Sequence, residues 1–139
     1  MDKRILVAFD GTDQSVAALE FAVGEWPDAD LVLLTVIDPS EAGFSAGRGV
    51  PSGAEEWYET MKAKAEGTLA DGVALVDREV ETDIEVGTPR EAIVDYAGEA
   101  DIDHVVIGSH GRKGISRILL GSVAEGVVRT SPVPVTVVR

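Results

Sequence analysis

The chain has 139 residues, of which 45% are hydrophobic, with no cysteine and a formal net charge of −13. This length suits one domain with a hydrophobic core, and the lack of thiols excludes a disulfide framework, thiol catalysis and a sulfur-ligated zinc site. The acidity argues against nucleic acid or an anionic membrane as a partner, because both would repel most of the surface.

No apolar stretch approaches the roughly 18 residues that a membrane span needs, and the first residues lead directly into a short apolar run. We therefore expect a soluble cytoplasmic protein. Residues 1–100 carry 22 acidic and 7 basic side chains, whereas residues 101–139 carry 3 acidic and 5 basic ones. Positive charge thus gathers near the C-terminus. Such acidity with only four lysines is typical of proteins adapted to a high-salt cytoplasm, the alternative being an ordinary acidic protein.

Two apolar runs in the first third of the chain predict strands buried on both faces of a parallel sheet. They cover residues 4–9 and 30–37. Between them, the turn sequence from Asp10 to Asp13 offers Thr12 or Asp13 as an N-cap. The apolar spacing that follows predicts a helix up to Gly24.

Residues 38–53 contain four glycines and two prolines, so we expect no regular structure there. This segment is either a plain connection or a flap near the functional site, and both interpretations stay open. Residues 54–70 have the spacing of an amphipathic helix. Residues 80–86 alternate apolar and charged side chains, which predicts a half-exposed strand at a sheet edge.

Thr88 and Pro89 form a helix start, with Thr88 as N-cap, so a helix is predicted over residues 89–99. A fourth strand is expected at 103–107, a helix from Val123, and a last strand at 133–138. Strands and helices alternate throughout. The order predicts one α/β domain over residues 1–139, with a five-stranded parallel sheet and helices on both faces.

A spaced run of glycines follows the fourth strand and leads into the last helix. Its members are Gly108, Gly111, Gly121 and, directly after the third glycine, Ser122. Glycines between a strand and a helix N-terminus let backbone N–H groups approach a phosphate, and the helix dipole favours the anion. We interpret the run as a nucleotide-phosphate cradle, the alternative being glycines that serve only as turns.

Two further features of this run favour the phosphate interpretation. Ser122 and Glu125 match a capping box, which places a helix start at the last glycine. Arg112 and Lys113 add positive charge between the second and third glycines.

The expected site lies where the strand order reverses, beyond the carboxyl ends of the strands. If the first and fourth strands are neighbours there, Asp10 and Gly108 face each other across the crevice. Asp10 can accept hydrogen bonds from a base or a ribose, and Val36 and Ile107 can flank an adenine. The alternatives are an Asx-turn for Asp10 and plain core packing for Val36 and Ile107.

The glycine pattern, Asp10 after the first strand, and the ending Pro132-Val133-Pro134-Val135 resemble the universal stress protein family over essentially the whole chain. The resemblance implies a sheet order of 3-2-1-4-5 and a homodimer formed through the last strand. It also implies bound ATP, often with a divalent metal such as Mg²⁺ or Mn²⁺ at the phosphates.

The resemblance further implies a set of contact residues. Those for the adenosine half are Ala8, Asp10 and Val36, and those for the rest of the nucleotide are Ile107, Gly108, Gly111, Gly121, Ser122 and Val123. Arg112 is added to the second set because of its positive charge. Ala8 stands where ATP-binding members often have proline, which leaves that one contact in doubt.

Hydrolysis would need a group that positions water and a group that neutralises developing charge. Arg112, Lys113 and a metal could neutralise charge, but no residue is an evident base, and His110 reads as an exposed loop histidine. We therefore predict a stress-response or signalling module that binds ATP without efficient turnover and whose nucleotide state an unknown protein partner reads. The alternatives are a slow ATPase or phosphotransferase, and an interaction protein with a vestigial pocket.

Overall fold

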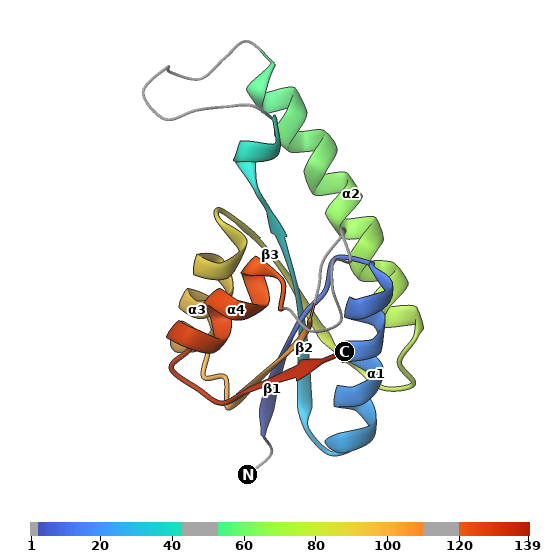
Figure 1. Cartoon of the computed structure of the whole chain (residues 1–139). Helices are drawn as coiled ribbons and strands as arrows, with labels where there is room; N and C mark the ends of the chain where they lie inside the picture. Colours follow the sequence, from blue (N-terminus) through green and yellow to red (C-terminus); the bar gives the residue numbers. More distant parts are fainter. Residues whose placement is uncertain (1–2, 43–52, 110–119) are drawn as a thin grey trace.

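The computed structural model describes residues 3–42, 53–109 and 120–139. Strands and helices alternate along these residues (Figure 1). The elements are β1 (Arg4–Ala8), α1 (Asp13–Glu25), β2 (Asp30–Ile37), the 3₁₀ helix η1 (Pro39–Ala42), α2 (Ala54–Ala74), β3 (Glu81–Val86), α3 (Pro89–Glu99), β4 (His104–Gly108), α4 (Ser122–Thr130) and β5 (Val135–Val138).

The strands form one parallel sheet of order β3-β2-β1-β4-β5. This confirms the predicted α/β class and the sheet order, and it confirms β3 as an edge strand. Strand β1 lies at the centre because its apolar residues can be covered on both faces. It pairs with β2 from Arg4 opposite Asp30 to Ala8 opposite Leu34.

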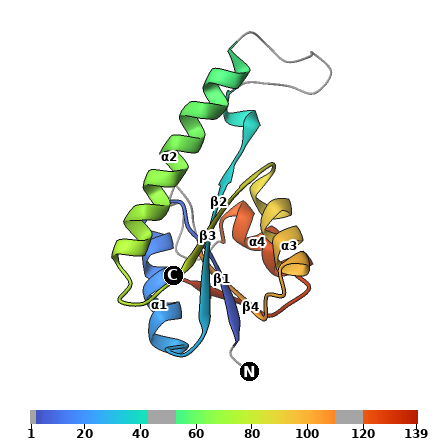
Figure 2. The ribbon, with the colours of Figure 1, turned by 180° about the vertical axis from the view of Figure 1, so that it is seen from behind.

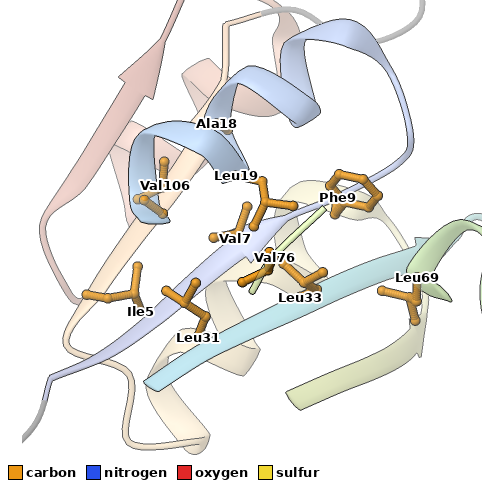
Figure 3. Packing of buried hydrophobic residues seen from close by; sticks show 11 residues of the cluster. Ile5, Val7, Phe9, Ala18, Leu19, Leu31, Leu33, Leu69, Val76 and Val106 are labelled. Atoms are coloured by element: carbon orange, nitrogen blue, oxygen red, sulfur yellow. The ribbon is translucent and has the colours of Figure 1, made fainter. Parts of the chain in front are cut away.

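Helices α1 and α2 cover one face of the sheet, and α3 and α4 cover the other (Figures 1 and 2). Successive side chains of a strand point to opposite faces. Ile5, Val7 and Phe9 therefore join the core under α1 and α2 (Figure 3), whereas Leu6 and Ala8 join the core under α3 and α4. The sheet thus has two separate apolar cores, one on each face.

Helix α2 is one turn longer than the predicted 54–70, and its N-terminal part projects beyond the sheet (Figure 1). The added turn contains Gly72, where a Cβ would lie 2.9 Å from Leu33 Cδ1 and 2.9 Å from Phe9 Cε2. Glycine is a weak helix former, but here it lets the helix approach the sheet closely. Tertiary packing therefore extends the helix past the point where local pattern ends it.

Two other predictions of local structure are wrong. Residues 39–42 form η1, where no regular structure was expected, because the Asp38 carboxylate accepts a hydrogen bond from the Ser40 N–H at 2.9 Å and starts a turn. Strand β5 begins at Val135 instead of Val133, because the Ser131 hydroxyl donates to the Val133 carbonyl at 2.7 Å and holds Val133 in a turn. Residues 43–52 lie outside the described residues, so the choice between a flap and a plain connection stays open.

The helix over 89–99 has the predicted bounds and Thr88 as its N-cap, but the Thr88 side chain makes no capping hydrogen bond. No helix in the described ranges combines the length and the apolar composition that crossing a membrane requires.

Candidate functional site

The sheet opens at its carboxyl edge between its two central strands. The pairing of β1 with β4 ends at Val7 opposite Val106, while β4 stays paired with β5 as far as Gly108 opposite Val138. The strand order reverses between β1 and β4. Ligands of doubly wound sheets bind at such a reversal, so this opening is the candidate site.

Asp10 follows β1 at this opening. The strand end is fixed to β2, because the buried Thr35 hydroxyl donates to the Phe9 carbonyl at 2.7 Å. One carboxylate oxygen of Asp10 accepts hydrogen bonds from the N–H of Thr12 at 3.0 Å and from its hydroxyl at 2.5 Å. The Asx-turn interpretation is therefore confirmed. Among the described residues none donates to the second oxygen, so a ligand contact at Asp10 stays a prediction.

Gly108 faces helix α1. A Cβ on Gly108 would lie 2.8 Å from Gln14 Cβ and 2.9 Å from the Gln14 carbonyl oxygen. No side chain fits there without moving the backbone of the first turn of α1. Gly108 is thus required by packing, a role that the phosphate-cradle interpretation did not include.

Gly121 is the N-cap of α4, with backbone angles of φ −65° and ψ 159°. Its N–H donates to the Ser109 carbonyl at 2.7 Å, so this amide is already bonded within the protein. The predicted capping box is wrong, because Ser122 is the first helical residue and Glu125 pairs with Arg129 at 3.0 Å. The helix does start at the last glycine, as predicted.

The first turn of α4 presents backbone N–H groups towards its N-terminal side. A helix leaves its first amides without intrahelical partners, and a glycine N-cap has no side chain to accept from them. Within the part of the chain that the structure describes, no group accepts from the amides of Ser122, Val123 or Ala124. These three amides, rather than that of Gly121, can meet an anion.

Ser109 is a residue whose role the sequence did not reveal. Its N–H donates to the Val138 carbonyl at 2.8 Å, and its carbonyl accepts from Gly121. It therefore connects the start of α4 to the end of β5. Its position between Gly108 and the rest of the glycine run was the only available signal, and its own residue type carried none.

Apolar side chains lie near the carboxyl ends of β1, β2 and β4, on the α3 and α4 face, and at the start of α4. The predicted residues of this group are Ala8, Val36, Ile107 and Val123, and the structure adds Leu120. Ile107 is 5% exposed and belongs to the core, whereas the other four are half-buried. The structure therefore brings together predicted residues from β1, β2, β4 and α4.

Several predicted residues lie outside the described residues, namely His110, Gly111, Arg112 and Lys113. Their contribution stays a prediction. Within the ranges that the structure covers, no three His, Asp or Glu side chains gather in a way that could hold a metal ion.

Among the described residues, the two groups with a shifted pKa lie away from the opening. Burial and the nearby Asp83 carboxylate raise the pKa of Tyr96, in α3, to about 12. Burial and the charge of Lys3 lower the pKa of His104, which begins β4 at the opposite end of the sheet and contacts Thr136 Oγ1 at 2.7 Å. Neither group is placed to transfer a proton at the carboxyl edge.

The chain belongs to the universal stress protein family, whose model matches residues 1–139. Universal stress protein MJ0577 of Methanocaldococcus jannaschii is 32% identical, over 100% of this chain and 96% of that protein. A solved structure of MJ0577 superposes with a TM-score of 0.86 at 31% identity, covering 99% of this chain and 96% of that one.

Two further solved structures are similar. The universal stress protein UspA from Lactobacillus plantarum has a TM-score of 0.82 and 29% identity, covering 99% of this chain and 97% of that one. A universal stress protein solved in complex with cAMP has a TM-score of 0.65 and 26% identity, also covering 99% of this chain and 97% of that one.

Proposed function

We propose that this universal stress protein binds ATP at the opening between β1 and β4 and acts in the cytoplasm as a nucleotide-dependent stress-response or signalling module without efficient hydrolysis. The observation that carries this proposal is the unpaired first turn of α4, whose amides at Ser122, Val123 and Ala124 have no acceptor among the described residues. Val123 and the half-buried Ala8 and Val36 pack against one apolar cluster, and an adenine would be placed against these side chains.

The family supports an adenine nucleotide as the ligand, because one relative of the same fold was solved with cAMP. In the proposed complex Ala8, Asp10 and Val36 contact the adenosine half, and Ile107, Gly108, Gly111 and Arg112 join the amides of α4 at the phosphates. Mg²⁺ or Mn²⁺ would be held by the phosphates.

Isothermal titration of ATP into the purified protein tests the proposal. We expect Gly121→Val to abolish binding, because a branched side chain at the N-cap crowds the amides that follow it. Its backbone angles permit any residue, so the variant should fold. Gly67→Val is the matched control, since a Cβ at Gly67 meets no atom within 4 Å. Nucleotide-free wild-type protein without affinity for ATP at cellular concentrations would overturn the proposal.

A second candidate is an interaction protein that does not use the pocket. Two observations favour it: the Gly121 amide is bonded to Ser109, and Gly108 is occupied by packing against Gln14. Native mass spectrometry of freshly purified protein separates the candidates, because an unused pocket predicts no co-purifying nucleotide. A true ATPase or phosphotransferase would instead require steady-state turnover well above about 1 per second, the usual scale for enzymes.

We also propose a homodimer formed through residues 133–138. Strand β5 pairs with β4 on one side, and its other edge has no partner among the described residues. The carbonyls of Pro134 and Val138 point to β4, so the backbone groups of Val137 point to the open edge. Pairing with a second copy would satisfy them.

Sedimentation equilibrium tests the dimer. We expect wild type to sediment as a dimer and Val137→Pro as a monomer, because proline removes a donor at the open edge only. The control Val137→Ala keeps the backbone donor and should stay dimeric. A wild-type monomer would contradict this interface.

The net charge of −13 supports adaptation to high salt. We expect the thermal midpoint of unfolding to rise steeply as KCl is added, because salt screens the repulsion among carboxylates. A midpoint that does not depend on salt would identify an ordinary acidic protein.

A further inference from the structure

The aliphatic part of Arg90 lies across helix α4. A Cβ on Gly126 would lie 2.7 Å from Arg90 Cδ and 3.2 Å from Arg90 Cβ. Gly126 is buried, while Arg90 as a whole residue is exposed. Glycine at position 126 therefore makes room for the stem of Arg90, and the charged end reaches solvent.

This contact lies close to the candidate site. Gly126 follows Ser122 by one helical turn, which corresponds to about 6 Å along the helix axis. Arg90 is the second residue of α3, which begins just after the carboxyl end of β3. The guanidinium is thus within reach of the first turn of α4, where the unpaired amides lie.

The charge of Arg90 has no counterpart among the described residues. Other arginines have partners: Arg4 pairs with Glu81, Arg78 donates to the carbonyls of Trp26 and Pro27, and Arg129 pairs with Glu125. Arg90 has no such partner within the described ranges. It also lies in the first turn of α3, where the helix dipole favours negative charge over positive. A bound anion would supply the negative charge that pairs with Arg90.

We propose that Arg90 binds the phosphate chain of the nucleotide and makes the site select nucleoside di- and triphosphates over nucleosides. This inference rests on the proposed function, because it assigns a further residue to that site. A guanidinium suits the role, since its planar donors can form two hydrogen bonds to phosphate oxygens. The space that Gly126 leaves free holds the aliphatic stem of Arg90 and so positions the guanidinium.

Titration calorimetry with ATP, ADP, AMP and adenosine tests the assignment. We expect Arg90→Gln to weaken ATP and ADP binding at least about tenfold, the usual scale for one charged hydrogen bond, and to leave adenosine binding unchanged. Arg90→Lys should recover part of the loss. The control is Arg129→Gln, which removes the same charge from the far end of α4 and should change ATP affinity less than about twofold.

Gly126→Ala provides an independent test that removes no charge. The new methyl group displaces the Arg90 stem, so ATP binding should weaken in the wild-type background and stay unchanged in the Arg90→Gln background. An unfolding curve for each variant verifies that it is folded, and alanine is the better helix former.

The outcomes separate the two proposals. If wild-type protein binds neither ATP nor adenosine, the proposed function fails. If wild type binds ATP but Arg90→Gln changes no affinity, or weakens ATP and adenosine equally, only the role of Arg90 is overturned.

Discussion

Helices α1 and α4 both begin at the carboxyl edge of the sheet, but their N-termini are satisfied in different ways. At α1 the Thr12 hydroxyl accepts from the Ser15 N–H at 3.3 Å, and Asp10 in turn holds Thr12. At α4 the N-cap is Gly121, which offers no side chain. One helix start is capped by the protein's own oxygens, whereas the first amides of the other have no acceptor among the described residues.

This difference shows that a glycine-rich strand-to-helix connection is not by itself a binding site. The role of each glycine depends on the atoms that pack against it. Gly108 accommodates α1, whereas Gly121 leaves the amides of α4 uncapped. Two predictions test whether the helix starts differ as described, and two test how α1 packs on the sheet.

The largest effect is expected from closing the open helix start. Gly121→Asp places a carboxylate where it can accept from the amides of Val123 or Ala124, and its charge repels phosphate. We expect ATP to bind about 100-fold more weakly, while the free energy of unfolding rises by a few tenths of a kcal/mol. Calorimetry and urea denaturation measure the two quantities. The control Gly121→Ala adds no acceptor and should bind ATP more tightly than Gly121→Asp. Unchanged ATP affinity in Gly121→Asp would refute the idea that the start of α4 is open.

The next effect concerns the packing of α1 on β4. Gly108→Ala forces a methyl group against the backbone of Gln14, and such overpacking costs about 1–3 kcal/mol of the free energy of unfolding. Urea denaturation measures this loss. The control Gly67→Ala meets no atom within 4 Å and should stabilise α2 by about 0.5–1 kcal/mol. Equal stabilities of the two variants would mean that α1 does not press on Gly108.

A smaller effect is expected from opening the closed helix start. Thr12→Ala removes the capping hydroxyl of α1 and should lower the free energy of unfolding by about 1 kcal/mol. Thr12→Ser keeps the hydroxyl and should stay close to wild type in the same denaturation assay. If Thr12→Ala is as stable as Thr12→Ser, the cap contributes nothing to α1.

The smallest effect lies at the other end of α1, where the Trp26 ring packs on His104 with ring centroids 4.8 Å apart. Because the folded state lowers the pKa of His104, the unfolded chain takes up the proton first on acidification. Stability is therefore full above pH 6.5, the ordinary histidine value, and falls as the pH drops below it. His104→Gln should lose this component in denaturation curves at about pH 7.5 and 5.5. Identical pH slopes for both proteins would contradict it.

Local pattern was sufficient wherever one run of residues determines the outcome. The bounds of β2 and α3 are as predicted, because a continuous apolar run and a proline helix start are both local signals. Local pattern was insufficient where the bounds of an element depend on contacts with residues outside its own run. Gly72 extends α2 because Phe9 and Leu33 lie beneath it, and Ser131 delays β5 by holding Val133.

The candidate site likewise has features that the sequence predicted and features that only the structure revealed. The sequence predicted its place, since Asp10 comes just after β1 and Gly108 ends β4, the two strands between which the order reverses. It did not reveal that the Gly121 amide bonds to Ser109, nor that Arg90 lies across Gly126.

By itself the sequence determined the alternation of strands and helices and the α/β class, because these follow from periodicity and from the chirality of crossovers. Only the tertiary structure decided which backbone amides remain unpaired and which glycines are needed for packing. The reason is physical: an amide is unpaired, or a glycine crowded, only in relation to atoms that folding brings from distant parts of the chain.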